Sequence, residues 1–78
     1  MPTAFVLVNY DLRTETEQEA IKRLKNVPGV IDVSKVNGVY DIVVKVASDT
    51  LESLKETITR DIRTIDTIRS TMTLIVIE

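Results

Sequence analysis

Residues 30–47 have the sequence VIDVSKVNGVYDIVVKVA, in which two segments rich in β-branched residues flank an Asn37-Gly38 pair. An Asn-Gly pair in this setting is a strong short-range signal for a β-hairpin, because both residues tolerate the left-handed conformation of a type I′ turn. The sequence therefore predicts two strands, Val30–Asn37 and Tyr40–Ala47, joined by a tight turn. The apolar face of the second strand consists of alternate residues, namely Tyr40, Ile42, Val44 and Val46.

An amphipathic helix is expected before this hairpin. Thr14 followed by Glu17 has the spacing of a capping box at a helix N-terminus. Pro28 disfavours the α conformation at Val27, and Gly29 accepts a positive φ, so the helix is expected to end there. The buried stripe of this helix is expected to consist of Ala20, Ile21, Leu24 and Val27.

The segment after the hairpin repeats the pattern of a helix followed by a strand. Ser48 fits the N-cap of a second helix, and so does Asp49 with Glu52 three residues later, and the sequence leaves this choice open. The outer strands are predicted over Thr3–Tyr10 and Thr71–Ile77. The buried stripe of the second helix is expected to consist of Leu51, Leu54, Ile58 and Ile62.

The predicted order of elements is strand, helix, strand, strand, helix, strand, in a single domain over residues 1–78. Right-handed crossovers turn this βαββαβ order into a ferredoxin-like α+β fold. In that fold a four-stranded antiparallel sheet carries both helices on one face. The other face of the sheet is left without a cover from the same chain.

The first predicted strand is apolar on both of its faces. Ala4, Val6 and Val8 share one face. Phe5 and Leu7 share the other, and a large apolar face is rarely left to water. A chain of 78 residues also has a thin core, and this one has no Cys or His for disulfides or common metal sites. We therefore expect a homodimer that packs sheet against sheet, in the manner of a dimeric α+β barrel.

The composition excludes several classes of function. Without His or Cys there is no imidazole base or thiolate nucleophile, and two glycines are too few for a phosphate loop, so no catalytic site, metal site or cofactor is expected. A net charge of -2 argues against direct binding of nucleic acid. No apolar run reaches the roughly 20 residues needed to cross a membrane, and no signal peptide is evident, so a cytoplasmic protein is expected.

Asp41 is the residue with the clearest choice between two roles. As a charge at a strand end it discourages edge-to-edge pairing, and this structural role is the one that the residues alone favour. As a carboxylate beside a turn it is also suited to hold the ammonium group of a ligand. Its neighbour Tyr40 fits a core aromatic better than a stacking platform.

The assembled pattern resembles the effector-sensing domain of Lrp/AsnC transcriptional regulators, known as the RAM domain. The resemblance covers essentially the whole chain, and its most specific part is the sequence Gly38-Val39-Tyr40-Asp41. It implies dimers formed through the sheets, assembly of dimers into an octamer-like ring, and binding of small effectors, commonly amino acids, near the hairpin between dimers. Carried over by position, the ligand-binding residues are Gly38, Tyr40 and Asp41, with Thr73, Leu74 and Ile75 as further candidates.

The chain also departs from the family pattern. Full-length members begin with a helix-turn-helix domain, for which there is no room before Thr3, so a stand-alone form is expected. Val39 and Met72 stand where polar or charged residues are frequent, which weakens the transfer of amino-acid binding and leaves a more apolar ligand, or none, as an alternative. The expected function is an effector-sensing and oligomerisation module that modulates transcription through a partner such as a full-length Lrp/AsnC regulator. The alternatives are a purely structural oligomerisation module without a ligand and an ACT-like amino-acid sensor.

Overall fold

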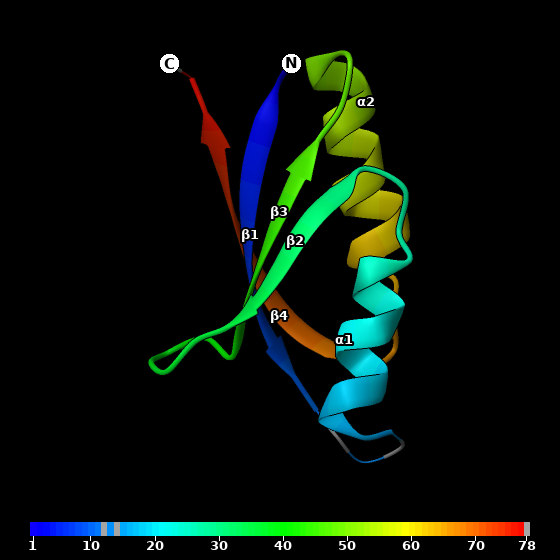
Figure 1. Ribbon diagram of the computed structural model, residues 1–78, viewed down its shortest axis with the longest axis vertical. Helices are drawn as coiled ribbons and strands as arrows, with labels where there is room; N and C mark the ends of the chain where they lie inside the picture. The colour runs from blue at the N-terminus through cyan, green and yellow to red at the C-terminus, as the bar shows by residue number, and fades with distance from the viewer. Residues whose placement is uncertain (12, 14, 78) are drawn as a thin grey trace.

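The computed structural model describes residues 1–11, 13 and 15–77, and it shows a four-stranded antiparallel sheet with helices on one face (Figure 1). The strand order is β2-β3-β1-β4, so β2 and β4 are the edges. The elements in chain order are β1 (Thr3–Tyr10), α1 (Glu17–Lys25), β2 (Val30–Lys35), β3 (Ile42–Ala47), α2 (Leu51–Glu56), η1 (Thr57–Ile62) and β4 (Ile68–Val76). The π-helix η1 continues α2, so the predicted βαββαβ order and fold class are confirmed.

The core lies between the sheet and the helices. On β1 and β3, every second residue has no exposed surface, as the period-two pattern predicts. Leu24 from α1 packs against these residues, together with Leu54 from α2. Leu51 is 44% exposed, although it was expected in the buried stripe. It is the first helical residue and has neighbours on one side only, so burial begins one turn later. The buried strand residues are Ala4, Val6, Val8, Ile42, Val44 and Val46.

The helix N-termini differ from the predicted ones. The N-cap of α1 is Thr16, whose hydroxyl accepts from the Glu19 backbone N–H at 3.2 Å, while Glu19 accepts from the Thr16 N–H at 3.0 Å. Thr14 lies outside the described residues. The segment TETEQE has the capping-box spacing twice, and the second copy forms the box. The N-cap of α2 is Thr50, bonded to the Ser53 N–H at 3.0 Å, and not Ser48 or Asp49.

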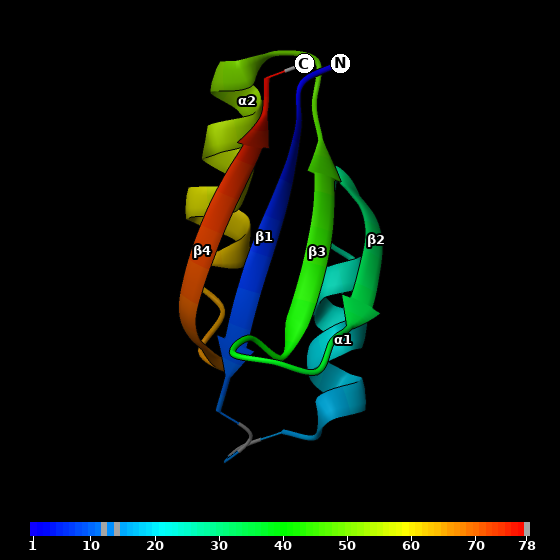
Figure 2. The ribbon, with the colours of Figure 1, turned by 90° about the vertical axis from the view of Figure 1, so that its left-hand side faces the viewer.

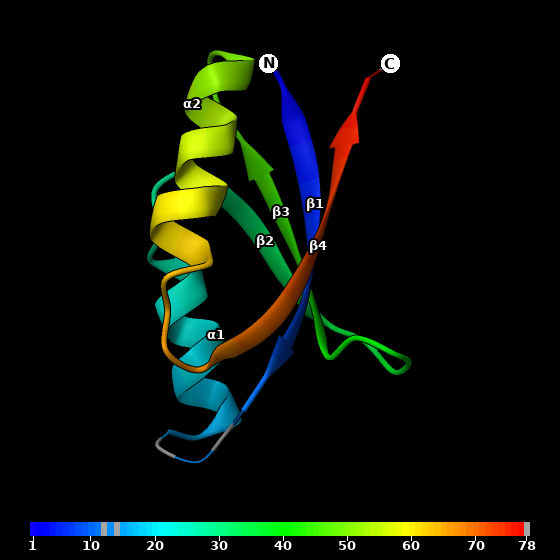
Figure 3. The same cartoon turned by 180° about the vertical axis from the view of Figure 1, so that it is seen from behind.

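The predicted tight turn at Asn37-Gly38 is wrong. A type I′ turn needs positive φ at both central residues, whereas among the described residues only Gly29 has one, at 94°. Pairing between β2 and β3 ends at Lys35 and Ile42, closed by a hydrogen bond from the Val36 N–H to the Asp41 carbonyl at 3.0 Å. Residues 36–41 therefore form a longer loop, and it projects away from the helices (Figure 3).

The face of the sheet opposite the helices is uncovered in the single chain (Figure 2), and it is largely apolar along β1 and β4. The strand register places Phe5 between Lys45 and Leu74. Met72 and Leu74 are 47% and 50% exposed on β4, and the Phe5 side chain is half-buried. The two-sided apolar character predicted for the first strand is thus confirmed. We call this surface, formed by Phe5, Leu7, Val43, Met72, Leu74 and Val76, the open face.

Candidate functional site

The loop between β2 and β3 is fastened to β1 by Asp41. The Asp41 backbone N–H donates to the Val8 carbonyl at 2.9 Å, and its carboxylate Oδ2 accepts from the Tyr10 N–H at 3.2 Å. The hydrogen-bonding groups around Asn9 orient its amide so that Nδ2 donates to Asp41 Oδ2 at 3.2 Å and to the Val39 carbonyl at 2.9 Å. These bonds explain why the loop departs from a tight turn, because they connect its base to β1.

The same geometry decides what each predicted loop residue can do. Among the described residues, the hydrogen bonds to the Asp41 carboxylate all end on Oδ2, so Oδ1 is left to accept a bond from a ligand. Gly38 is exposed, and a side chain added there would meet no atom within 4 Å. Tyr40 is half-buried. The loop therefore offers a carboxylate beside accessible backbone.

The second group of predicted residues lies elsewhere in the sheet. Thr73 pairs with Val6 and Ile75 pairs with Ala4, on the β4 side of β1, whereas Asp41 bonds to β1 from the β3 side. Leu74 belongs to the open face. Within one chain the structure therefore does not bring Thr73, Leu74 and Ile75 together with Gly38, Tyr40 and Asp41.

A polar cluster that the sequence analysis missed lies beneath the base of this loop. The Tyr10 hydroxyl donates to Glu17, and Glu17 also pairs with Lys35, with 2.5 Å between Nζ and Oε1. Burial is the main cause that raises the pKa of Tyr10 to about 12, and the hydrogen bond to the Glu17 carboxylate is the second cause. The pKa of Glu17 is lowered mainly by its hydrogen bond with Lys35 and secondly by its hydrogen bond with Tyr10. The only signal in the sequence is that Tyr10 shares an apolar face with Val8, and a buried Tyr hydroxyl needs a partner.

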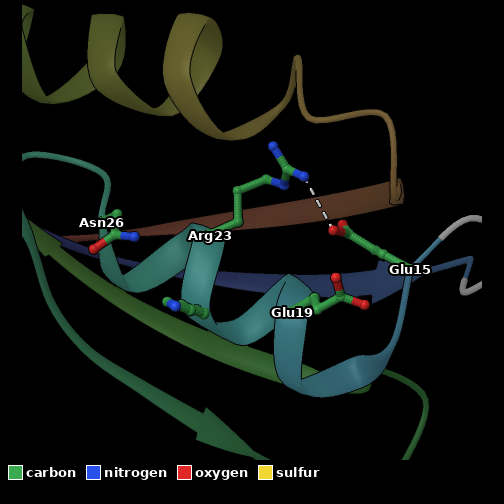
Figure 4. Close-up of a pocket in the computed structure, with 5 residues that line it drawn as sticks. Glu15, Glu19, Arg23 and Asn26 are labelled. Atoms are coloured by element: carbon green, nitrogen blue, oxygen red, sulfur yellow. Dashed lines mark hydrogen bonds and ion pairs between the residues drawn. The ribbon is translucent and has the colours of Figure 1, made fainter.

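A second cluster lies along α1, beside a cleft of about 310 Å³ that also reaches Glu19 and Asn26 (Figure 4). The Glu15 carboxylate is 8% exposed and accepts from Thr67 and from Arg23 Nη2, the latter at 3.1 Å. The pKa of Glu15 is lowered mainly by the hydrogen bond from the Thr67 hydroxyl and secondly by the hydrogen bond from Arg23. In turn, Glu15 raises the pKa of Arg23. The Thr67–Glu15 hydrogen bond joins the segment before β4 to the segment before α1. The ion pair with Arg23 neutralises the Glu15 charge.

The described residues include no group of three acidic, His or Cys side chains that could hold a metal ion. Within the described part of the chain, no helix has the length and apolar character needed to cross a membrane. The loop at residues 36–41 and the open face are two surfaces where a ligand or a partner could bind.

Residues 3–78 match the family of the Lrp/AsnC ligand binding domain. The chain belongs to the Lrp/AsnC family. An uncharacterised HTH-type transcriptional regulator of Pyrococcus furiosus is 32% identical to it over 74 residues, which are 94% of this chain and 49% of the regulator. The chain thus spans about half the length of the curated relatives it matches. The family is one of transcriptional regulators and not of enzymes, in agreement with the expectation from composition.

Solved structures place the fold in the same family. The crystal structure of FFRP-DM1 is 39% identical, with a TM-score of 0.88, over 99% of this chain and 100% of that one. E. coli AsnC is 27% identical, with a TM-score of 0.85, over 99% of this chain and 51% of that one. A transcriptional regulator of Neisseria meningitidis, solved as a complex with L-Met, shares the fold at 11% identity and a TM-score of 0.81, over 99% of this chain and 50% of that one.

Proposed function

We propose that this domain is an effector-sensing and oligomerisation module that binds a small metabolite at a subunit interface. The observation that carries the proposal is the fastened loop at residues 36–41. It holds Asp41 in place through β1 and projects on the side of the open face (Figure 2). A binding residue on a rigidly held loop keeps its geometry without a large ordering cost.

The open face supports self-association. Met72, Leu74 and Val76 are each more than 40% exposed, and they lie beside Phe5 and Leu7. Covering such an apolar surface is favourable by roughly 25 cal/mol per Å². We infer that a second copy packs on it sheet to sheet, and that such dimers join further into an octamer-like ring.

The effector site is then completed by more than one subunit. Gly38, Tyr40 and Asp41 come from one copy, and Thr73, Leu74 and Ile75 come from another, since a single chain keeps the two groups apart. An amino acid fits the loop, because Asp41 Oδ1 can accept from an ammonium group and the exposed backbone at Gly38 can donate to a carboxylate. The L-Met complex of the Neisseria meningitidis regulator supports this ligand class.

The family supports a proposal about the partners of this chain. The matched relatives are named transcriptional regulators, and this domain matches about half of their length. We infer that it acts in the cytoplasm and modulates transcription by assembling with a full-length Lrp/AsnC regulator. It would not contact DNA itself, because its net charge of -2 supplies no positive field.

Calorimetric titration of the free amino acids, with the molar mass measured by light scattering, tests the proposal. In Asp41→Asn the amide oxygen still accepts from the Tyr10 N–H, but the charge is lost, so affinity for the bound amino acid should fall about tenfold or more. The matched control is Asp32→Asn, which changes an exposed carboxylate on β2 and should leave affinity unchanged. A monomeric chain that binds none of the amino acids would refute the proposal.

The internal hydrogen bonds of Asp41 favour a second candidate, a structural oligomerisation module without an effector. In that case Asp41 serves only to fasten the loop. The oligomer would form as described above, but its melting temperature would not respond to any added amino acid. Asp41→Asn would then change stability slightly and nothing else.

A further inference from the structure

A cleft of about 210 Å³ lies between the second helix and the edge strand β4. Figure 2 shows α2 running alongside β4 behind the sheet. The volume of the cleft is below the roughly 300–1,000 Å³ typical of sites for drug-sized ligands, so the cleft suits a small metabolite. Its lining residues are Lys55, Ile58, Thr59, Arg63, Thr73 and Ile75.

The helical wall of the cleft has an unusual backbone. From Thr57 to Ile62 the chain is π-helical, and the Arg63 N–H donates to the Ile58 carbonyl, five residues earlier, at 3.0 Å. Helices of this kind are rare and are found frequently at functional sites. Here the wide turn contributes Ile58 and Thr59 to the cleft, and it ends at Arg63.

Polar side chains on this wall have no partners in the described part of the chain. Lys55, Thr59 and Arg63 follow one another at intervals of four residues, which places them on one side of the helix. Neither cation forms an ion pair there, whereas Arg60 in the same turn pairs with Glu56 and Asp61.

The β4 wall of the cleft adds a hydroxyl group, and two isoleucines form its apolar floor. Thr73 lines the cleft from β4, its hydroxyl has no intramolecular hydrogen bond among the described residues, and Ile58 and Ile75 supply apolar contact. Among the described residues, no carboxylate lines the cleft. Its described lining therefore has two positive charges and two hydroxyls over an apolar floor, with no negative charge to pair with an ammonium group.

We infer that this cleft binds a small aliphatic carboxylate that has no ammonium group, such as a branched-chain 2-oxo acid. The planar guanidinium of Arg63 matches a carboxylate, and Lys55 adds a second positive charge. The hydroxyls of Thr59 and Thr73 can donate to a neighbouring keto oxygen, and the aliphatic chain rests on Ile58 and Ile75. The loop at residues 36–41 is not part of this cleft, and there Asp41 would select the opposite feature, an ammonium group. Thr73 and Ile75 are candidates for both sites.

Two probes with the same side chain test the inference, 4-methyl-2-oxopentanoate and L-leucine. Each is titrated into the isotope-labelled protein, and the amide signals of Ile58 and Thr59, which line only the cleft, are followed by NMR. The 2-oxo acid should shift these signals saturably, with an affinity at least about tenfold above that of leucine at the same signals. Added salt should weaken binding, because the two cations are exposed.

Two substitutions and one control assign the site. Lys55→Met and Arg63→Met should each weaken binding of the 2-oxo acid about tenfold, since each removes one charged partner. Lys25→Met removes an exposed cation from α1 and should leave binding unchanged. Circular dichroism confirms that each variant is folded before it is titrated.

The outcomes separate this site from the effector loop. Equal or tighter binding of leucine at the signals of Ile58 and Thr59 would overturn the inference. So would the absence of saturable shifts, or binding that survives both Lys55→Met and Arg63→Met. Asp41→Asn should leave binding of the 2-oxo acid unchanged, so failure of the effector loop and failure of the cleft give different results.

Discussion

Replacing Leu24 by Ala tests how α1 is held against the sheet. The buried residues of this helix are Ala20 and Leu24, and Leu24 is 1% exposed. Leu24 is therefore the large side chain of α1 that is fully buried, and Ile21 packs beside it against the same core while only partly buried. Truncation of a fully buried Leu costs about 2.7–5 kcal/mol, because the transfer free energy is lost and a cavity remains.

This loss is large for so small a domain. At roughly 0.05–0.15 kcal/mol per residue, the whole chain is stable by about 4–12 kcal/mol. A loss of about 3 kcal/mol corresponds to a fall in melting temperature of about 12–24 °C, at about 4–8 °C per kcal/mol. The free energy of unfolding is measured by urea denaturation, followed by circular dichroism. Wild type and variant are compared at one protein concentration, because self-association adds to apparent stability.

Leu51→Ala is the matched control. Leu51 is also a helical leucine, but it is 44% exposed, so its truncation should change the free energy of unfolding by no more than about 0.5 kcal/mol. Equal losses for the two variants would refute the reasoning, and so would a loss below about 1 kcal/mol for Leu24→Ala. Either result would mean that α1 is held by contacts other than those described.

Two further predictions concern pH and backbone conformation. The pKa values of Glu15 and Glu17 are lowered in the fold, so their contribution to stability is complete above the ordinary carboxylate pKa and is lost as the pH falls through the lowered values. Urea unfolding between pH 6 and pH 2 should therefore show a decline that is shallower in Glu15→Gln and Glu17→Gln, and an unchanged slope in both would contradict the described pairs. Gly29 has a φ of 94°, and an added side chain would lie 3.0 Å from the Ala47 carbonyl oxygen, so Gly29→Ala should cost about 1–2 kcal/mol or more. Gly38→Ala, in open space and without a positive φ, should stay within about 0.5 kcal/mol, and thermal unfolding of the two variants measures the difference.

The parts of the fold that follow from periodicity could be predicted from the sequence. The alternation in β1 and β3 predicts which residues share a face, because successive side chains of a strand point to opposite faces. For β1 both faces are apolar, so the sequence left open which of them meets the helices. A helix-capping motif does not fix the start of a helix where the motif occurs twice in succession. The segment TETEQE contains two capping boxes, and sequence alone does not choose between them. The loop at Asn37-Gly38 is set by hydrogen bonds from Asp41 to β1, which lies about thirty positions earlier in the chain and is invisible to a local pattern.

In the candidate sites, too, the positions of residues could be read from the sequence, whereas their contacts with other strands could not. The position of Asp41 beside a turn was visible in the sequence, but its bonds to Asn9 and Tyr10 were not, since they join separate strands. The four-residue spacing of Lys55, Thr59 and Arg63 is present in the sequence, but the sequence analysis did not single it out. That β4 lies beside this stripe depends on the strand order, which places the last strand at the sheet edge.

The pairing of Thr3 with Val76 puts the two ends of the chain side by side. They lie at one end of the sheet and the loop at residues 36–41 lies at the other (Figure 2). The distance between them is the length of β1, roughly 23 Å at about 3.3 Å per residue. A domain or tag joined at either terminus would therefore be carried far from the effector loop. A short linker between the termini would also permit circular permutation, with new ends opened in that loop.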